Sequence, residues 1–274
     1  MMRRGLLLAA LSLTAAAQDG VRIAGPSSPA PGAAFVMERS RRWSEAIQVE
    51  LAGEVLHEQS ASGSLAYVCK VEVVSGTETK LTFEKATYED GGRVREMELD
   101  GKTIVMKREG DEVSFALAGG GEPTDDASEF LEGEFGRARK TPSLLPPDEV
   151  ATGETWRVSL EDLAGRLGLE WDAFRAEKFE GAARLAAIAE KDGASMATIE
   201  IALDAAPEAM DGNRLTESEL TIAATLEVPV EGTVPYRSLS AKASLSGVGA
   251  PEKGTADIMT EYRMTFELEE KVRP

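Results

Sequence analysis

Hydrophobic and polar residues alternate with a period of two along two long stretches of the chain, 47–117 and 180–268. This alternation places one face of each strand on a core and the other in water, which is typical of antiparallel sheet. Turn sequences separate the alternating runs, so strands that are neighbours in the sequence pair most economically as a meander. We therefore predict a mainly β protein with a minority of helix, in which antiparallel meanders form a strongly curved sheet or an open barrel.

Short turn sequences mark where the strands should reverse. Asp100-Gly101 lies between two short alternating runs and is predicted to close a two-residue hairpin. Asp192-Gly193 is predicted to join two longer runs in the second stretch. The last run is the longest, and its inward phase is expected to hold Ile258, Thr260, Tyr262, Met264, Phe266 and Leu268.

A helical connector at about 123–177 is predicted between the two meander halves, at about 41–122 and 178–272. Thr124-Asp-Asp126 has the side chains of a helix N-terminus, and the apolar residues Phe130, Leu131 and Phe135 follow it. A second helix is expected to begin at Ser159 and continue to Trp171. We expect residues 41–272 to form one β-rich domain.

The N-terminal residues 1–17 have the composition and order of a signal peptide. Arg3 and Arg4 precede a short apolar run, and Ala15 and Ala17 fit a signal peptidase site with cleavage between Ala17 and Gln18. The alternative is a buried N-terminal helix. Residues 18–40, which contain the Pro-, Ser- and Gly-rich stretch 20–34, are predicted to form a flexible leader.

The expected location follows from the same region. No apolar run approaches the roughly 20 residues of a transmembrane helix, so no transmembrane segment is expected. No Cys follows the apolar run of the signal, so a lipobox is absent. We therefore expect a soluble protein in the periplasm or outside the cell.

Composition excludes several kinds of partner and site. The formal net charge is −18, and it becomes −20 once Arg3 and Arg4 leave with the signal peptide, so nucleic acid and anionic membrane surfaces are not expected partners. One His and one Cys exclude two-His zinc motifs, Cys-based metal sites and an internal disulfide. Cys69 falls in the apolar phase of its run, which favours an inert core residue over a thiol that pairs between chains.

His57, which is predicted to end the first strand in its apolar phase, is the one imidazole that a catalytic site could use. Ser60 and Ser62 lie near it in sequence, but no G-x-S-x-G elbow surrounds any Ser, which favours a structural or half-exposed His. A triad stays open as the alternative, because its members need not be close in sequence. The carboxylate pairs Asp125-Asp126 and Glu269-Glu270 need no catalytic explanation in so acidic a chain, and glycoside hydrolysis is not favoured.

An acidic segment near the glycine run 119–121 is the one candidate for a metal. A solvated acidic loop is favoured there. The alternative is a calcium site, in which the carboxylate oxygens would be the ligands of the ion. The glycine run lacks the Lys-Ser/Thr of a phosphate cradle and is interpreted as a turn. We therefore predict no catalytic, cofactor-binding or metal-ligating residue and no cofactor. The acidic residues of this segment are Asp111, Glu112, Glu122, Asp125 and Asp126.

The segment from Leu144 to Trp156 is the most distinctive in the chain. Pro147 and Val150 precede a turn at Gly153, and Trp156 is expected to start the next element and anchor the connector in the core. This Pro/Val/Gly-Glu-Thr-Trp pattern resembles a motif of uncharacterised exported bacterial β-rich proteins. The strand layout is similar to lipoprotein-carrier-like half-barrels. The resemblance implies an extracytoplasmic β fold with an apolar cavity, and it supplies no catalytic residues.

Three functional hypotheses remain. The first is a non-catalytic exported protein that binds an apolar ligand, such as a lipid, or a protein partner through its curved sheet. The second is a structural or interaction protein of the envelope without a small-molecule ligand. The third is a hydrolase, which the missing site motifs disfavour.

Overall fold

A computed structural model of the chain describes residues 20–23, 30–110, 112–136, 144–158, 163, 167, 181–210, 213–231, 237–251 and 258–273. Strands dominate this part of the chain, and the helical elements lie together after the sixth strand. The elements are β1 Ala34–Leu51, β2 Glu54–Val73, β3 Glu78–Asp90, β4 Arg93–Glu96, β5 Thr103–Glu109, β6 Glu112–Leu117, α1 Asp125–Leu131, the π-helical turn η1 Glu132–Gly136, β7 Thr155–Val158, β8 Gly181–Lys191, β9 Ala194–Ala205, β10 Ala209–Met210, β11 Asn213–Pro229, β12 Ser238–Pro251 and β13 Ile258–Arg273.

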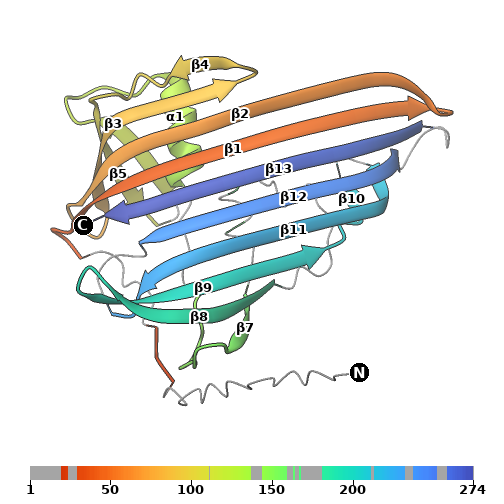
Figure 1. Cartoon of the computed structure of the whole chain (residues 1–274). Coiled ribbons are helices and arrows are strands. Elements are labelled where there is room, and N and C mark those ends of the chain that lie inside the picture. Colours follow the sequence, from red (N-terminus) through yellow and green to blue (C-terminus); the bar gives the residue numbers. More distant parts are fainter. Residues whose placement is uncertain are drawn as a thin grey trace, which may run out of the picture.

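Thirteen strands of the described part form one antiparallel sheet. Its order is β6-β5-β3-β2-β1-β13-β12-β11-β9-β8-β7, with β4 beside β3 and β10 beside β11. The chain leaves the centre at β1, reaches the β6 edge, crosses to the β7 edge and returns to the centre at β13. The first and last strands therefore pair, from Val36 with Arg273 to Leu51 with Ile258, and join the two meanders. Figure 1 shows the long strands curving together, so the predicted mainly β, curved antiparallel sheet is confirmed.

One face of the sheet, here called the inner face, carries the core. At the β2–β3 side it is covered by α1, which lies behind the sheet in Figure 1, and by η1, whose Phe135 packs against Phe83 of β3. Tyr67, Phe83, Phe130 and Phe135 form an aromatic cluster there, with ring centroids 5.6–6.3 Å apart. Edge-to-face contacts of this kind add to the free energy gained by burial alone. The helical cover is thus fixed to the sheet mainly by aromatic packing.

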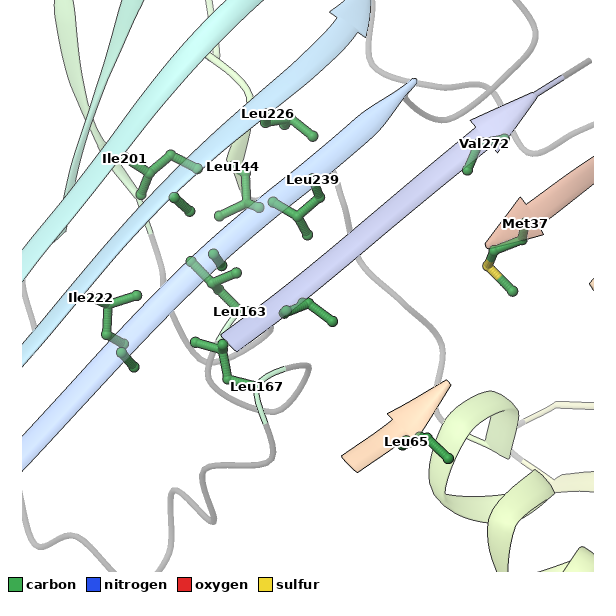
Figure 2. Packing of buried hydrophobic residues seen from close by; sticks show 14 of the residues in the cluster. Met37, Leu65, Leu144, Leu163, Leu167, Ile201, Ile222, Leu226, Leu239 and Val272 are labelled. Carbon is green, nitrogen blue, oxygen red and sulfur yellow. The ribbon is translucent and has the colours of Figure 1, made fainter. Parts of the chain in front are cut away.

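The other half of the inner face is covered by residues of the connector. Leu144, Leu163 and Leu167 are almost completely buried. Figure 2 shows these three side chains gathered near Ile222 and Leu239 of β11 and β12. Burial of aliphatic side chains against alternating strand residues explains why the second meander shows so regular a period of two.

Several predicted elements are confirmed. Asp192 and Gly193 both have positive φ, 53° and 76°, and form the tight turn between β8 and β9. The first helix begins after Thr124, with Phe130 and Leu131 buried. The six inward positions predicted for the last run all lie in β13, and four of them pack in or against the core as side chains of one face.

The predicted flexible leader is wrong at its start as well as at its end. Val21 forms an antiparallel bridge with Val150, and the Ile23 side chain is buried in the core. Residues 34–40 are not a flexible segment but the start of β1, which is paired on both sides, with β2 and with β13. The cause lies in the inward positions of β1, where Arg39 and Arg41 replace the apolar residues that would have revealed a period of two.

Two details of the first meander also need correction. His57 does not end the first strand, because Ala52 and Gly53 turn the chain and His57 belongs to β2 as an exposed residue. Asp100-Gly101 does not close a hairpin, because β4 and β5 both pair with β3. Asp100 instead accepts a hydrogen bond from the Ala86 amide at 2.7 Å, which connects the β4–β5 link to β3.

Some predictions fall outside the described residues. These are the signal peptide 1–17 and the second helix, Ser159 to Trp171, except for the buried side chains of Leu163 and Leu167. No helix of the described part is long and apolar enough to cross a membrane.

Candidate functional site

A row of three polar side chains crosses the centre of the inner face. Tyr67 on β2, Arg39 on β1 and Glu270 on β13 are direct cross-strand neighbours. Nη1 of Arg39 lies 3.2 Å from Oε1 of Glu270 and 2.8 Å from Oε2 of Glu134, which comes from η1 above the sheet. The Tyr67 hydroxyl donates to Oε2 of Glu134 at 3.3 Å. We call these four residues the buried charge cluster.

The cluster is removed from solvent. The side chains of Arg39, Glu134 and Glu270 are exposed by 2%, 5% and 0%. Transfer of such charges out of water costs several kcal/mol per ion, and the cost is offset only by close pairing and hydrogen bonds. Since Glu134 is the residue that belongs to η1, the cluster ties the helical cover to the two central strands.

Arg41 borders the cluster on the same face of β1. Its Nη1 lies 3.7 Å from Oε1 of Glu134, and its guanidinium carbon lies 5.7 Å from the centroid of the Trp43 ring. Burial lowers the pKa of Arg41, and the positive charge of Arg39 adds to this, while Glu134 acts in the opposite direction. The Arg41 side chain remains 23% exposed, so a cation lies where the covered part of the inner face ends.

A group of apolar side chains continues along the inner face beyond Arg41. These side chains pack against the core but remain half-buried. Trp43 is paired with Phe266, and its ring centroid lies 5.8 Å from that of Tyr88. Glu45 lies among them on β1, so the surface is amphipathic. The members of this inner-face patch are Trp43, Ile47, Tyr88, Met264 and Phe266.

The opposite, outer face has a different chemistry. A row of hydroxyl side chains crosses five of its strands in register, and a hollow of about 390 Å³ lies beside part of that row. A second hollow, of about 240 Å³, lies nearer the chain ends of the central strands and is lined by charged residues such as Lys85 and Glu269. Polar and apolar atoms both line these hollows. The residues of the hydroxyl row are Ser62, Ser44, Thr265, Ser244 and Thr221.

The residues weighed for a catalytic triad are not brought together in β2. His57 is opposite Val49 and belongs to the inner face, whereas Ser60 and Ser62 belong to the outer face. Successive residues of a strand point to opposite faces, so neither hydroxyl reaches the imidazole. His57 is exposed rather than structural.

The acidic segment shows no metal geometry in the part of the chain that is described. Glu112, Glu122, Asp125 and Asp126 are all exposed, and Asp111 lies outside the described residues. Among the described residues, no three His, Cys, Asp or Glu side chains are placed so that they could hold a metal ion. The pair Glu269-Glu270 is split by the strand, with Glu269 outside and Glu270 in the buried charge cluster.

Cys69 lies in the core, as its phase predicts, with no exposed surface. Burial, and secondarily the charge of Glu84, raises the pKa of its thiol to about 12. The thiolate is the reactive form of cysteine. The native thiol is therefore inert.

We expect Cys69 to make stability pH-dependent at alkaline pH. Above roughly pH 8.5 the unfolded chain releases the thiol proton while the folded chain retains it until about pH 12, so stability falls as the pH rises through this interval. Urea unfolding at about pH 8 and about pH 10 should show a smaller loss for Cys69→Val than for the wild type. Equal losses, or rapid modification of the native thiol at about pH 8, would contradict this.

Trp156 confirms the predicted role of the distinctive segment. Gly153 forms the turn with φ of 90°, and β7 begins at Thr155. The half-buried Trp156 donates its indole N–H to the carbonyl of Leu144 at 3.3 Å. The hydrogen bond from Trp156 thus holds Leu144, at the start of the segment, against β7.

The buried charge cluster was missed from the sequence. One signal was present, because continuing the inward phase of the last run from Leu268 places Glu270 on the inner face. No comparable signal identifies Glu134, whose burial depends on where the helical cover packs. Arg39 was hidden by its assignment to the leader.

Comparisons with known proteins identify no family. No family model and no curated protein matches the chain. The solved structure "Lipid-protein interactions in lipovitellin" is similar with a TM-score of 0.40 and 9% identity, over 89% of this chain and 25% of that chain. OpdQ of Pseudomonas aeruginosa is similar with a TM-score of 0.23 and 8% identity, over 88% of this chain and 98% of that one. The chain spans about a quarter of the lipovitellin chain, and similarity at this level carries no argument about function.

Proposed function

We propose that this protein is a non-catalytic exported binding protein. It holds an apolar ligand, such as a lipid, or the apolar surface of a partner protein against the inner face of its curved sheet. The observation that carries the proposal is the inner-face patch, where three aromatic rings and two further apolar side chains stay half-buried beside a fully covered core.

The arrangement of the patch favours an elongated ligand with a polar end. Trp43, Met264 and Phe266 offer a continuous apolar surface across β1 and β13. Arg41 stands at the end of this surface, over the Trp43 ring, and keeps a partly exposed guanidinium. Guanidinium groups pair well with carboxylates and phosphates. A ligand with an apolar chain and an anionic group would bury the chain on the inner-face patch and pair the anionic group with the Arg41 guanidinium.

The ligand lies along the face rather than inside a closed pocket. Under α1 and η1 the inner face is filled by side chains such as Phe83 and Leu131, which have no exposed surface. The hollows of about 240 and 390 Å³ lie on the outer face, on the opposite side of the sheet from the patch. An open apolar surface also suits a partner protein, which is why both occupants belong to the proposal.

Export is part of the proposal and rests on the order of charge, apolar run and small residues in 1–17. The chain expressed in full in a Gram-negative host should be recovered from the periplasm or medium with Gln18 as its first residue. That preparation then serves for the binding experiment. Recovery only from the cytoplasm with Met1 retained would contradict export.

The binding experiment titrates this protein with a fluorescent long-chain fatty acid. Wild type should bind it saturably, and Ile47→Ser or Met264→Ser should each weaken binding by about tenfold or more, because each removes a large apolar contact. Met259→Ser is the matched control, since Met259 is 48% exposed on the outer face of β13. The proposed apolar ligand would be ruled out if the wild type did not bind the fatty acid saturably. It would also be ruled out if Met259→Ser lost as much affinity as Ile47→Ser and Met264→Ser.

A further inference from the structure

Strand β2 is longer than its outer neighbour. On one side β1 pairs with β2 along its whole length, from Leu51 opposite Glu54 to Ala34 opposite Glu72. On the other side β3 pairs with β2 only from Gly63 onward. Figure 1 shows β2 running past the end of β3 toward the β1–β2 turn. Among the described residues, the stretch Glu54–Ser62 therefore has a strand on one side only. We call it the open β2 edge.

The backbone of this edge is oriented for hydrogen bonding. The Gly91 amide, in the turn after β3, donates to the Ser62 carbonyl at 3.0 Å, so Ser62 directs its polar backbone groups away from β1. Backbone direction alternates along an antiparallel strand. Ser60 and Glu58 therefore also present both N–H and C=O outward. An edge of this kind is a template for another strand.

The hollow of about 390 Å³ lies at the end of the open β2 edge. Its walls include Ser60, Ser62 and the Gly91 turn, and Arg263 closes it on the β13 side. The hollow exists because the side chains of β2 are small there. The Gly91 turn marks the point where an added strand would meet the end of β3. A strand that continues the line of β3 along β2 would place an outward side chain at this hollow.

The charge around the edge selects the partner. Glu54 and Glu58 lie on the edge, and Glu50 lies next to them, opposite Val55. Val55 and Leu56 are 55% and 58% exposed. A second copy of the chain would bring the same carboxylates against these ones, in a protein of net charge −18. A basic segment with apolar residues complements both the carboxylates and the exposed aliphatic side chains.

We propose that the open β2 edge accepts an extended, basic segment of a partner protein as an added strand. The irregularity between Val49 and Glu50, where Leu56 is the extra residue of β2, limits the regular ladder to His57–Ser62. Main-chain hydrogen bonds to Glu58 and Ser60 supply the affinity, and Glu58 selects Lys or Arg. This site is separate from the inner-face patch and does not depend on the ligand proposed for it.

The test titrates a short, fluorescently labelled peptide of alternating Lys and Val with the full mature chain. Binding is measured as the increase in the fluorescence anisotropy of the peptide. The Lys-Val peptide should bind, and the same peptide with Glu in place of Lys should not. N-methylation of those alternate amides of the peptide that face β2 should weaken binding by about tenfold, since it removes backbone hydrogen bonds. Methylation leaves the protein unchanged, so this arm does not depend on the folding of a variant. Equal binding of methylated and unmethylated peptides would overturn the proposal, because charge attraction alone would then explain binding.

Protein variants give the second arm. Ser60→Pro removes an outward amide that makes no bond to β1, and proline is tolerated at such edge positions. It should weaken peptide binding by about tenfold, while Ser60→Ala, which keeps the amide, should bind as the wild type does. Equal binding by a folded Ser60→Pro would overturn the proposal. A wild-type dimer in sedimentation that Ser60→Pro dissociates would also overturn it, in favour of pairing between two copies.

Discussion

Replacement of Arg39 by Met should lower the free energy of unfolding by about 3–5 kcal/mol, which is the usual cost of removing one partner from a buried ion pair. Met keeps most of the side-chain packing, so the loss reports the charge. Glu134 and Glu270 would remain buried without the guanidinium that lies 2.8 and 3.2 Å from them. Urea unfolding of the variant against the wild type measures the difference.

Two controls separate charge burial from other causes. The triple variant Arg39→Met, Glu134→Leu, Glu270→Leu should recover most of the lost stability, because a buried ionic group can often be replaced by apolar side chains at little net cost. Lys242→Gln breaks the exposed pair with Glu267 and should leave the urea midpoint unchanged. If Arg39→Met costs no more than Lys242→Gln, or the triple variant is the least stable, the cluster does not hold the helical cover as described.

The second meander was predictable from the sequence because its inner face is far more apolar than its outer face. In β9, β11 and β12 the inward residues are mainly Leu, Ile, Val or Ala, and the outward ones are mostly polar. A period of two then follows from burial alone. Turns such as Asp192-Gly193 add a local signal, because their conformation needs positive φ.

The first meander was harder to predict because its inner face is not uniformly apolar. Along β1 the inward residues Arg39, Arg41 and Glu45 interrupt the pattern between Met37 and Ile47. Glu134 and Glu270, which are distant in sequence, pair with the two arginines, and no local rule anticipates these partners. The pairing of β4 and β5 with the same strand likewise depends on the length of β3, not on the Asp100-Gly101 turn.

The candidate sites show the same division. The inner-face patch could be found in part, since Met264 and Phe266 lie in the predicted inward phase of the last run. Trp43 could not be placed on that face while the first strand was taken to begin near Ile47. The open β2 edge exists because β2 extends beyond the end of β3. A sequence pattern does not reveal which of two neighbouring strands is longer.

Gly63→Ala should be the most damaging small substitution in β2. Gly63 lies opposite Trp43, and a Cβ there would overlap the indole ring and lie 2.6 Å from the Glu89 carbonyl oxygen. The Trp43 ring can shift only by giving up its contact with Tyr88, 5.8 Å away between centroids, and the Glu89 oxygen belongs to the backbone of β3. Overpacking of this kind costs about 1–3 kcal/mol, and two simultaneous overlaps place the expected loss near the upper end.

The experiment compares urea unfolding of Gly63→Ala with that of Gly76→Ala. Gly76 has open space around its Cβ position and no positive φ, so its replacement should be neutral or slightly stabilising through the unfolded chain. Adding Trp43→Leu to Gly63→Ala should give a double variant more stable than the sum of the two single losses predicts, since the smaller side chain removes one of the two overlaps. Additive losses would show that Trp43 and Gly63 are not in contact. The inner-face patch would then lack the fixed indole on which its shape depends, and the junction where β3 ends would have to be held by other contacts.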